Sequence, residues 1–165
     1  MNHTHAMQRV LQISRFGMEA GHGGPFGAVV LRNGDIVGEG FNRVLTSFDP
    51  TAHGEAVAMR DACSKLRSFD LHDCDLYAIG LPCPLCMHAI FWARIKRVFH
   101  VMTEDDAKAI GFNLKHYYDE FGASGRPRSL ELVQLPGFRE EAKALYEAWR
   151  DKKDRVNYTP HQEKA

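Results

Sequence analysis

Two cysteines, a histidine and a glutamate have the spacing in this chain that could support metal chemistry. Cys83 and Cys86 open an apolar helical run, so one helical turn can present both thiols to a single metal ion. His53, about thirty residues upstream, supplies a third ligand. Three protein ligands leave the fourth tetrahedral position of zinc open for water, as in catalytic rather than structural sites. We therefore predict one zinc ion (Zn2+) per chain, bound by these three residues and a water molecule.

Glu55 lies two residues after His53 and is placed to move protons beside this metal. Residues two apart on a helix do not share a face, so Glu55 is better placed to contact the water than the metal. Zinc makes hydroxide available at neutral pH, and one carboxylate can protonate both a ring nitrogen and a departing amine. A His-x-Glu followed by Pro-Cys-x-x-Cys is the signature of zinc deaminases. The spacing predicts hydrolytic removal of an amine from a heteroaromatic ring, with Glu55 as the catalytic residue.

Two other interpretations of the Cys-x-x-Cys pair stay open. It could be a thiol redox pair, or half of a structural zinc site in a ligand-binding or interaction domain. A structural site predicts a fourth protein ligand and a Glu55 that can be replaced without effect. The remaining cysteines, Cys63 and Cys74, are interpreted as buried structural residues.

Length and composition predict a single domain over residues 1–165, with residues 155–165 as a C-terminal tail. The formal net charge is zero, which disfavours a nucleic-acid-binding protein because such proteins carry a basic excess. No apolar run approaches the roughly 18 residues of a membrane span, and no secretory signal is visible. The four cysteines are typical of reduced thiols or metal ligands. We therefore expect a cytoplasmic protein that does not contact membranes.

Alternating strand and helix patterns predict the elements that position these residues. The expected strands cover residues 25–31, 36–44, 76–79, 97–102 and 130–135. The expected helices cover residues 4–20, 52–66, 83–95, 104–110 and 113–121, followed by a loop over 122–127 and a last helix over 138–149. The last helix is expected to carry an apolar stripe that consists of Phe138, Ala142, Leu145, Tyr146 and Trp149. This alternation predicts an α/β protein with one mixed sheet covered by helices.

Several positions carry more specific expectations. Asn33-Gly34 predicts a two-residue hairpin turn, and Gly38 and Gly40 are candidate bulge sites in the next strand. An apolar stripe on the helix that begins at position 52 is expected to face inward and consists of Ala56, Met59, Cys63 and Leu66. Three residues away from the thiol face predict a second buried face or a subunit interface: Phe91, Trp92 and Ile95.

With these motifs the chain resembles the cytidine deaminase superfamily and, within it, the bacterial guanine deaminases. The resemblance covers most of residues 1–100 and, more loosely, the last helix. It depends on the zinc signature and on four further stretches, namely Gly23 to Val29, Gly40 to Asn42, Asp49 to His53, and Trp92 to Arg94. It implies a cytidine deaminase-like fold, a three-layer sandwich in which helices flank a central five-stranded mixed sheet.

The resemblance further implies that a small-molecule nucleobase binds beside the zinc. Asn42 would hydrogen-bond the base, and Phe26 and Trp92 would form aromatic walls. Tyr158 would close the pocket from a C-terminal segment that is swapped between the subunits of a homodimer; a tail residue without this role is the alternative. Gly54 stands where relatives usually have alanine, which would open space beside the ligand. The reaction implied is the conversion of guanine to xanthine plus ammonia.

Departures from the family pattern leave the substrate open. Leu81 stands where many relatives have glutamate, and Asn113-Leu114 follow Gly111-Phe112 where guanine deaminases often have acidic residues. One alternative is a deaminase of another aminated purine, pyrimidine, triazine or nucleoside. The other is a tRNA adenosine deaminase, which needs a positive surface and salt-sensitive RNA binding. The neutral net charge disfavours this last alternative.

Overall fold

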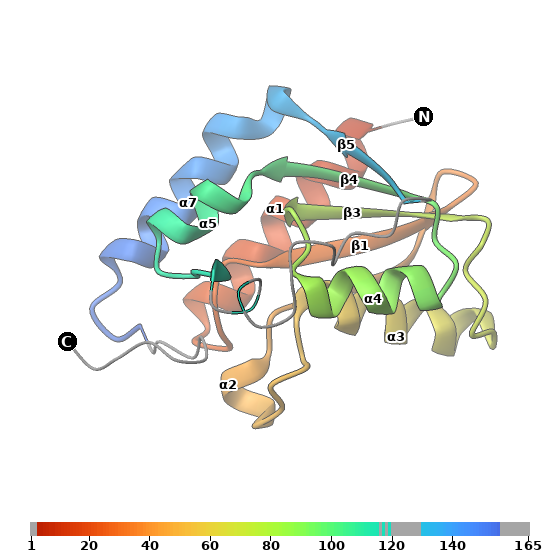
Figure 1. Ribbon diagram of the computed structural model, residues 1–165, viewed down its shortest axis with the longest axis horizontal. Helices are drawn as coiled ribbons and strands as arrows, with labels where there is room; N and C mark the ends of the chain where they lie inside the picture. Colours follow the sequence, from red (N-terminus) through yellow and green to blue (C-terminus); the bar gives the residue numbers. More distant parts are fainter. Residues whose placement is uncertain (1–2, 116, 118, 120–129, 156–165) are drawn as a thin grey trace.

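The computed structural model describes residues 3–115, 117, 119 and 130–155, and its centre is a five-stranded mixed sheet in the order β2-β1-β3-β4-β5 (Figure 1). The strands are β1 (Gly27–Arg32), β2 (Asp35–Phe41), β3 (Cys74–Gly80), β4 (Arg97–Met102) and β5 (Glu131–Gln134). β1 runs antiparallel to both β2 and β3, whereas β3, β4 and β5 are parallel. The expected mixed sheet is confirmed, with each strand within a few residues of its predicted range.

Helices cover both faces of this sheet, which gives the three layers expected (Figure 1). One face carries α1 (His3–Glu19) and α7 (Arg139–Asp151), and the other carries α3 (Gly54–Leu66) and α4 (Pro84–Trp92). The buried residues accordingly fall into two clusters, one on each side of the sheet. On α7 the predicted apolar stripe is confirmed for Ala142, Leu145, Tyr146 and Trp149, which are all buried, whereas Phe138 precedes the helix and is half-buried.

The predicted hairpin turn joins β1 to β2. Asn33 (φ 54°) and Gly34 (φ 95°) both have left-handed backbone, as a two-residue turn of this hairpin type requires. β2 ends at Phe41 and not at the expected position 44, because the short helix α2 (Val44–Ser47) begins there. The strand has one irregularity, since Val30 pairs with Gly38 while Leu31 pairs with Ile36.

Gly38 and Gly40 serve a different purpose from the bulge sites that the sequence suggested. The irregularity lies beside Gly38, but Gly40 pairs regularly with Ala28. A Cβ added to Gly38 would lie 2.4 Å from the Ala58 carbonyl oxygen, and one added to Gly40 would lie 2.4 Å from the Ala58 amide nitrogen. Helix α3 therefore rests directly on the backbone of β2, with no side chain between them.

The predicted inward stripe of α3 is confirmed in part. Met59 is buried, and the half-buried Cys63 and Leu66 pack against the core cluster on this side of the sheet, whereas Ala56 is half-buried. The fully buried face of α3 consists of Gly54, Glu55, Ala58, Met59 and Ala62. The close approach of α3 to β2 explains why small residues dominate this face.

The expected helix over 83–95 is α4 followed by a turn. Of its two predicted buried faces, one is confirmed and the other is not. Its thiol-bearing face is buried, through Cys86, Met87 and Ile90. Ile95 is buried in the core and 3% exposed, whereas Phe91 and Trp92 are 51% and 87% exposed. The second buried face is therefore wrong for Phe91 and Trp92.

The segment after β4 begins with α5 (Glu104–Ala109), close to its predicted range. Thr103 and Asp106 form a capping box at its start, and the Asp106 carboxylate also accepts two hydrogen bonds from Arg139 at the start of α7. Of the helix expected over 113–121, residues 115, 117 and 119 are helical, and the remainder lies largely outside the described residues, as does the loop over 122–127. No helix in the described ranges combines the length and apolarity needed to cross a membrane.

Candidate metal centre and active site

The three predicted metal ligands come together at the start of two helices. His53 is the N-cap of α3 and Cys83 is the N-cap of α4, and each backbone carbonyl accepts the first helical hydrogen bond. Pro84 follows Cys83 at the first helical position, where a missing N–H costs nothing. Cys86 lies one turn further along α4 and is fully buried. Because helix N-termini favour negative charge, the start of α4 favours a thiolate at Cys83.

The distances among these three side chains fit zinc. The His53 Nδ1 atom lies 3.4 Å from the Cys83 Sγ and 3.6 Å from the Cys86 Sγ. Tetrahedral zinc with ordinary Zn–S and Zn–N bonds places such donors about 3.6 Å apart. All three donor atoms lie within 4.8 Å of one another, and no fourth His, Cys or carboxylate of the described residues joins the group. Three donors among the described residues match the three protein ligands of a catalytic zinc site.

The electrostatics of the group also suit a cation. A hydrogen bond from Cys86 and the neighbouring His53 hold the pKa of Cys83 well below its usual value. Burial alone would lower the pKa of His53, but the hydrogen bond and negative charge of Cys83 raise it. The hydrogen bond with Cys83 and burial place the pKa of Cys86 well above its usual value. A bound metal would displace the protons that these groups share, as metal ligands require.

Glu55 lies beside the ligand group and is almost completely buried, with 9% of its surface exposed. Its Oε2 atom accepts a hydrogen bond from the Cys86 thiol at 3.5 Å. Burial and the nearby negative charge of Cys83 raise the pKa of the Glu55 carboxyl. A buried carboxyl group with a raised pKa, in contact with a metal-binding group, is suited to general acid–base catalysis.

Asn42 and Phe26 are joined through their backbones close to this group. The Asn42 amide donates a hydrogen bond to the Phe26 carbonyl at 2.7 Å. The Asn42 side chain is 2% exposed, and its Oδ1 atom accepts a hydrogen bond from the Val44 amide at 3.2 Å. Gly23 makes room for it, because a Cβ there would lie 2.1 Å from the same oxygen. The structure therefore holds two of the predicted base contacts in one rigid unit.

Gly54 lies between this unit and the metal group. A Cβ on Gly54 would lie 2.6 Å from the Phe26 carbonyl oxygen and 3.1 Å from the Gly27 Cα. The space that the missing side chain was expected to open is therefore filled by the Phe26 backbone. Gly54 therefore packs against the protein backbone.

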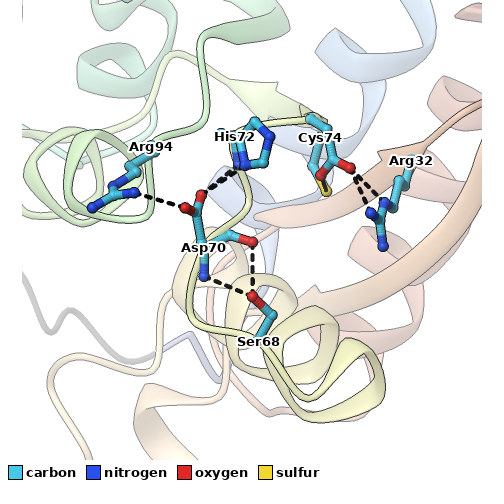
Figure 2. Close-up of polar contacts among 7 residues, drawn as sticks. Arg32, Ser68, Asp70, His72, Cys74 and Arg94 are labelled. Carbon is cyan, nitrogen blue, oxygen red and sulfur yellow. Dashed lines mark hydrogen bonds and ion pairs between the residues drawn. The ribbon is translucent and has the colours of Figure 1, made fainter.

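Trp92 does not join the other predicted site residues in this chain. Cys83 precedes the first residue of α4 and Trp92 is the last, so about 13 Å of helix separates them. Trp92 instead lines a shallow surface hollow with Phe69, Phe91 and Arg94. Figure 2 shows how this end of α4 is fixed, since the Asp70 carboxylate accepts a hydrogen bond from Arg94 at 2.7 Å and also lies 3.0 Å from the His72 ring. Tyr158 lies outside the described residues.

The aromatic residues that support Phe26 could not be identified from the sequence. Its ring meets Phe112 edge-on, with centroids 4.7 Å apart, and Tyr146 at 5.7 Å. Tyr146 is fully buried, and its hydroxyl has no hydrogen-bond partner among the described residues. Tyr146 was expected only as part of an apolar helix stripe, so its polar end facing Gly80 at the end of β3 could not be anticipated.

Comparisons with known proteins agree with this site. The family model for the cytidine and deoxycytidylate deaminase zinc-binding region matches residues 1–102. A guanine deaminase from Bacillus subtilis (strain 168) is 40% identical over 158 residues, covering 96% of this chain and all of the relative. A tRNA-specific adenosine deaminase from Haemophilus influenzae is 35% identical over 98 residues, which cover 59% of this chain and 56% of the relative.

Solved structures give the same picture. The crystal structure of guanine deaminase from Bacillus subtilis has a TM-score of 0.71 and 41% identity, and the match covers 96% of this chain and 99% of that chain. A structure of guanine deaminase from Nitrosomonas europaea has a TM-score of 0.75 at 27% identity, over 88% of this chain and 82% of that chain. The likeness thus extends beyond the residues that form the metal group.

Proposed function

The chain belongs to the cytidine and deoxycytidylate deaminase family, a family of zinc-dependent hydrolases of C–N bonds, and on this premise we propose that it deaminates guanine to xanthine and ammonia. The observation that carries the proposal is the three-donor group with Glu55 in contact with it. A guanine deaminase that matches almost the whole chain supports guanine over other aminated rings. The family and the zinc cofactor expected from the sequence are both confirmed.

Each residue of the group has a role in this proposal. His53, Cys83 and Cys86 hold the zinc ion, which when bound supplies the Lewis acidity that lets water lose a proton near neutral pH. Glu55 accepts the proton that the water loses and delivers it to a ring nitrogen as the new C–O bond forms. Glu55 then takes up the remaining proton from the newly added hydroxyl group and delivers it to the exocyclic amine as the C–N bond breaks, so that ammonia leaves and the ring keeps the oxygen as a carbonyl. Its burial keeps bulk water from competing for these protons.

The base binds beside this group, between residues that the fold already holds in place. Phe26 supplies an apolar face for the ring, and its contacts with Phe112 and Tyr146 fix that face. Asn42 supplies a side-chain amide to the polar edge of the base, with Gly54 setting the backbone between them. The backbone amide of Asn42 donates a hydrogen bond to the Phe26 carbonyl. The residue that would contact the face of the base and the residue that would contact its edge are therefore held together.

We further propose that residues 1–165 work as one domain within a cytoplasmic homodimer. Phe91 and Trp92 support this, because two large apolar side chains on one helix end are 51% and 87% exposed. In this arrangement Trp92 and Tyr158 complete the base pocket from the subunit interface and the C-terminal segment. The oligomeric state is measured by light scattering on the full chain, and a monomer at micromolar concentration would contradict it.

A single experiment tests the reaction. Zinc-loaded protein is incubated with guanine, and xanthine formation and ammonia release are followed together. The same assay is run with aminopurines, aminopyrimidines, triazines and the corresponding nucleosides. We expect guanine to have the highest kcat/KM, and a protein that leaves every one of these compounds intact would disprove the proposed reaction.

The partial likeness to tRNA-specific adenosine deaminases supports a second candidate, deamination of adenosine in tRNA. The zero net charge argues against it, since RNA binding depends on neutralising backbone phosphates. A filter-binding assay with tRNA over a range of salt concentrations separates the two candidates. Tight binding that weakens steeply with salt would favour the tRNA candidate over guanine.

A further inference from the structure

We propose that Tyr146 is a further substrate-binding residue, whose hydroxyl donates a hydrogen bond to the ring carbonyl of guanine. Tyr146 is fully buried on α7, and its hydroxyl has no hydrogen-bond partner among the described residues. A buried hydroxyl without a partner is unfavourable, and buried polar groups of folded proteins nearly always have one. A bound base supplies such a partner. This role rests on the proposed function, because it takes guanine as the substrate.

The hydroxyl lies at the end of β3, where the chain leads into the metal-binding segment. A Cβ added to Gly80 would lie 2.5 Å from the Tyr146 hydroxyl oxygen, but 3.9 Å from the ring carbon that carries this oxygen. The missing side chain at Gly80 therefore makes room for the hydroxyl and not for the ring. Gly80 is the last residue of β3 and precedes the first thiol of the metal group, Cys83, by three positions.

Two further parts of the proposed site lie near this hydroxyl. The Phe26 ring, which forms a face of the base pocket in the proposed function, meets the Tyr146 ring edge-on with centroids 5.7 Å apart. Burial and, to a lesser degree, the negative charges of Glu55 and Asp106 raise the pKa of Tyr146. The hydroxyl therefore keeps its proton at neutral pH and is available as a donor.

The side from which Tyr146 approaches indicates the atom of guanine that it meets. The metal ligands and Glu55 belong to α3 and α4 on one face of the sheet, whereas α7 covers the other face (Figure 1). The amine-bearing carbon of guanine has to face the metal group for the reaction. The opposite edge of the base, which carries the carbonyl oxygen and N7, then points away from the metal. Of these two acceptors, the carbonyl oxygen projects further from the ring.

The test compares Tyr146→Phe with the wild type and with Tyr77→Phe. Tyr77 is a matched control, because it is buried in the same core cluster but its hydroxyl is hydrogen-bonded to the His3 ring at 3.0 Å. For the zinc-loaded proteins, kcat and KM are measured with three bases that all carry the reacting amine. Guanine has both acceptors, 2-aminopurine lacks the carbonyl, and 7-deazaguanine lacks N7. Dissociation constants are measured by calorimetry in the Glu55→Gln background, in which turnover should be slow.

We expect Tyr146→Phe to raise KM and the dissociation constant about tenfold for guanine and for 7-deazaguanine, the scale of one hydrogen bond. With 2-aminopurine both values should stay within about twofold, because the acceptor is missing. The value of kcat should stay within about threefold of wild type, because this bond is made equally in the ground state and the transition state. Tyr77→Phe should match the wild type with every base, and all proteins should keep their zinc.

Gly80→Ala tests the position of the hydroxyl without any ligand. The added methyl group should collide with the hydroxyl of Tyr146, whereas phenylalanine at position 146 leaves room for it. Gly80→Ala should therefore lower the midpoint of urea unfolding in the wild-type background and lower it much less in the Tyr146→Phe background. Equal effects in the two backgrounds would show that the hydroxyl does not lie against Gly80.

Three affinity results would overturn the role of Tyr146: an unchanged affinity for guanine in Tyr146→Phe, an equal loss for guanine and 2-aminopurine, or a loss that is absent with 7-deazaguanine. A crystal structure of Glu55→Gln with guanine would overturn it too, if the hydroxyl were bonded to water or to another part of the chain. Failure of the proposed function looks different. There the wild type would release no ammonia from guanine, while the dissociation constants would still decide whether Tyr146 binds the carbonyl.

Discussion

Replacing Glu55 with glutamine tests the proposed reaction most directly. Glutamine has nearly the same size and shape as glutamate, so the first turn of α3 and the contact with Cys86 can persist. It cannot take up or release protons near neutral pH. The substitution therefore removes the proton carrier while leaving the three metal donors in place.

The magnitude of the expected loss follows from the burial of Glu55. General acid–base catalysis by one group contributes about 10²- to 10⁴-fold, which corresponds to about 2.7 to 5.4 kcal/mol of activation free energy. Glu55 is 9% exposed, so bulk water cannot reach the site freely to replace it. We therefore expect Glu55→Gln to lower kcat by about 10³- to 10⁴-fold, the upper part of this range.

The free energy of unfolding of Glu55→Gln should not fall together with its activity. Burial and the charge of Cys83 raise the pKa of Glu55, which means that the folded protein disfavours the ionised carboxylate. A neutral amide removes that unfavourable charge, so the variant should be at least as stable as the wild type. Activity and stability are thereby separated within one substitution.

The assay measures xanthine formation, zinc per chain and the midpoint of urea unfolding for each protein. Glu147→Gln is the control, because Glu147 is a half-exposed glutamate on α7 that pairs with Lys143 at 3.9 Å. It should leave all three measurements unchanged. A Glu55→Gln variant that keeps zinc and retains more than about a tenth of the wild-type kcat would refute the role of Glu55 in proton transfer.

Three further substitutions test the metal group, a buried hydroxyl and a helix cap. After dialysis against a chelator, Cys86→Ser should hold no zinc, as measured by atomic absorption, and should unfold at a lower temperature, as measured by calorimetry. Retention of one zinc per chain would exclude Cys86 as a ligand. Tyr146→Phe should raise the free energy of unfolding by about 1 kcal/mol, because a buried hydroxyl without a partner among the described residues is removed, and a loss of stability in urea would show that the hydroxyl is bonded. Asp106→Asn should lower the free energy of unfolding by about 1 kcal/mol at pH 7 through loss of the capping box and of the pairing with Arg139. Hydrogen bonds from Arg139 are the main reason that the pKa of Asp106 is lowered to about 2. The difference in free energy of unfolding between the wild type and Asp106→Asn should therefore be complete above pH about 4 and shrink as the pH falls towards 2. A difference that does not change with pH would contradict this charge-based account.

The metal group could be predicted from the sequence because its chemistry depends on short, local spacings. Cys83 and Cys86 lie one helical turn apart, so any helix that begins there presents both thiols on one side. His53 needed only to stand at a helix start, which the pattern after position 52 already indicated. The hairpin at Asn33-Gly34 was equally accessible, since both residues favour the left-handed backbone that the turn requires.

The contacts between elements could not be predicted in the same way. Periodicity favoured Cys63 and Leu66 for the inner face of α3, and both pack partly against the core, but the close approach to β2 is made largely by Ala58 and Ala62. The exposure of Trp92 depends on where α4 ends, which is set by the left-handed Arg94 and its bond to Asp70. These outcomes depend on distances between segments that are remote in the chain.

The seating of α3 on β2 has a consequence for directed evolution of this protein. Where two backbones touch, there is no flexible side chain to absorb a substitution, so changes at Gly38, Gly40 or Ala58 would shift the whole helix and the reactive groups at its start. Libraries aimed at new amine substrates should leave this contact untouched. Diversity is better introduced at Phe112, whose side chain meets other side chains that can be repacked around it.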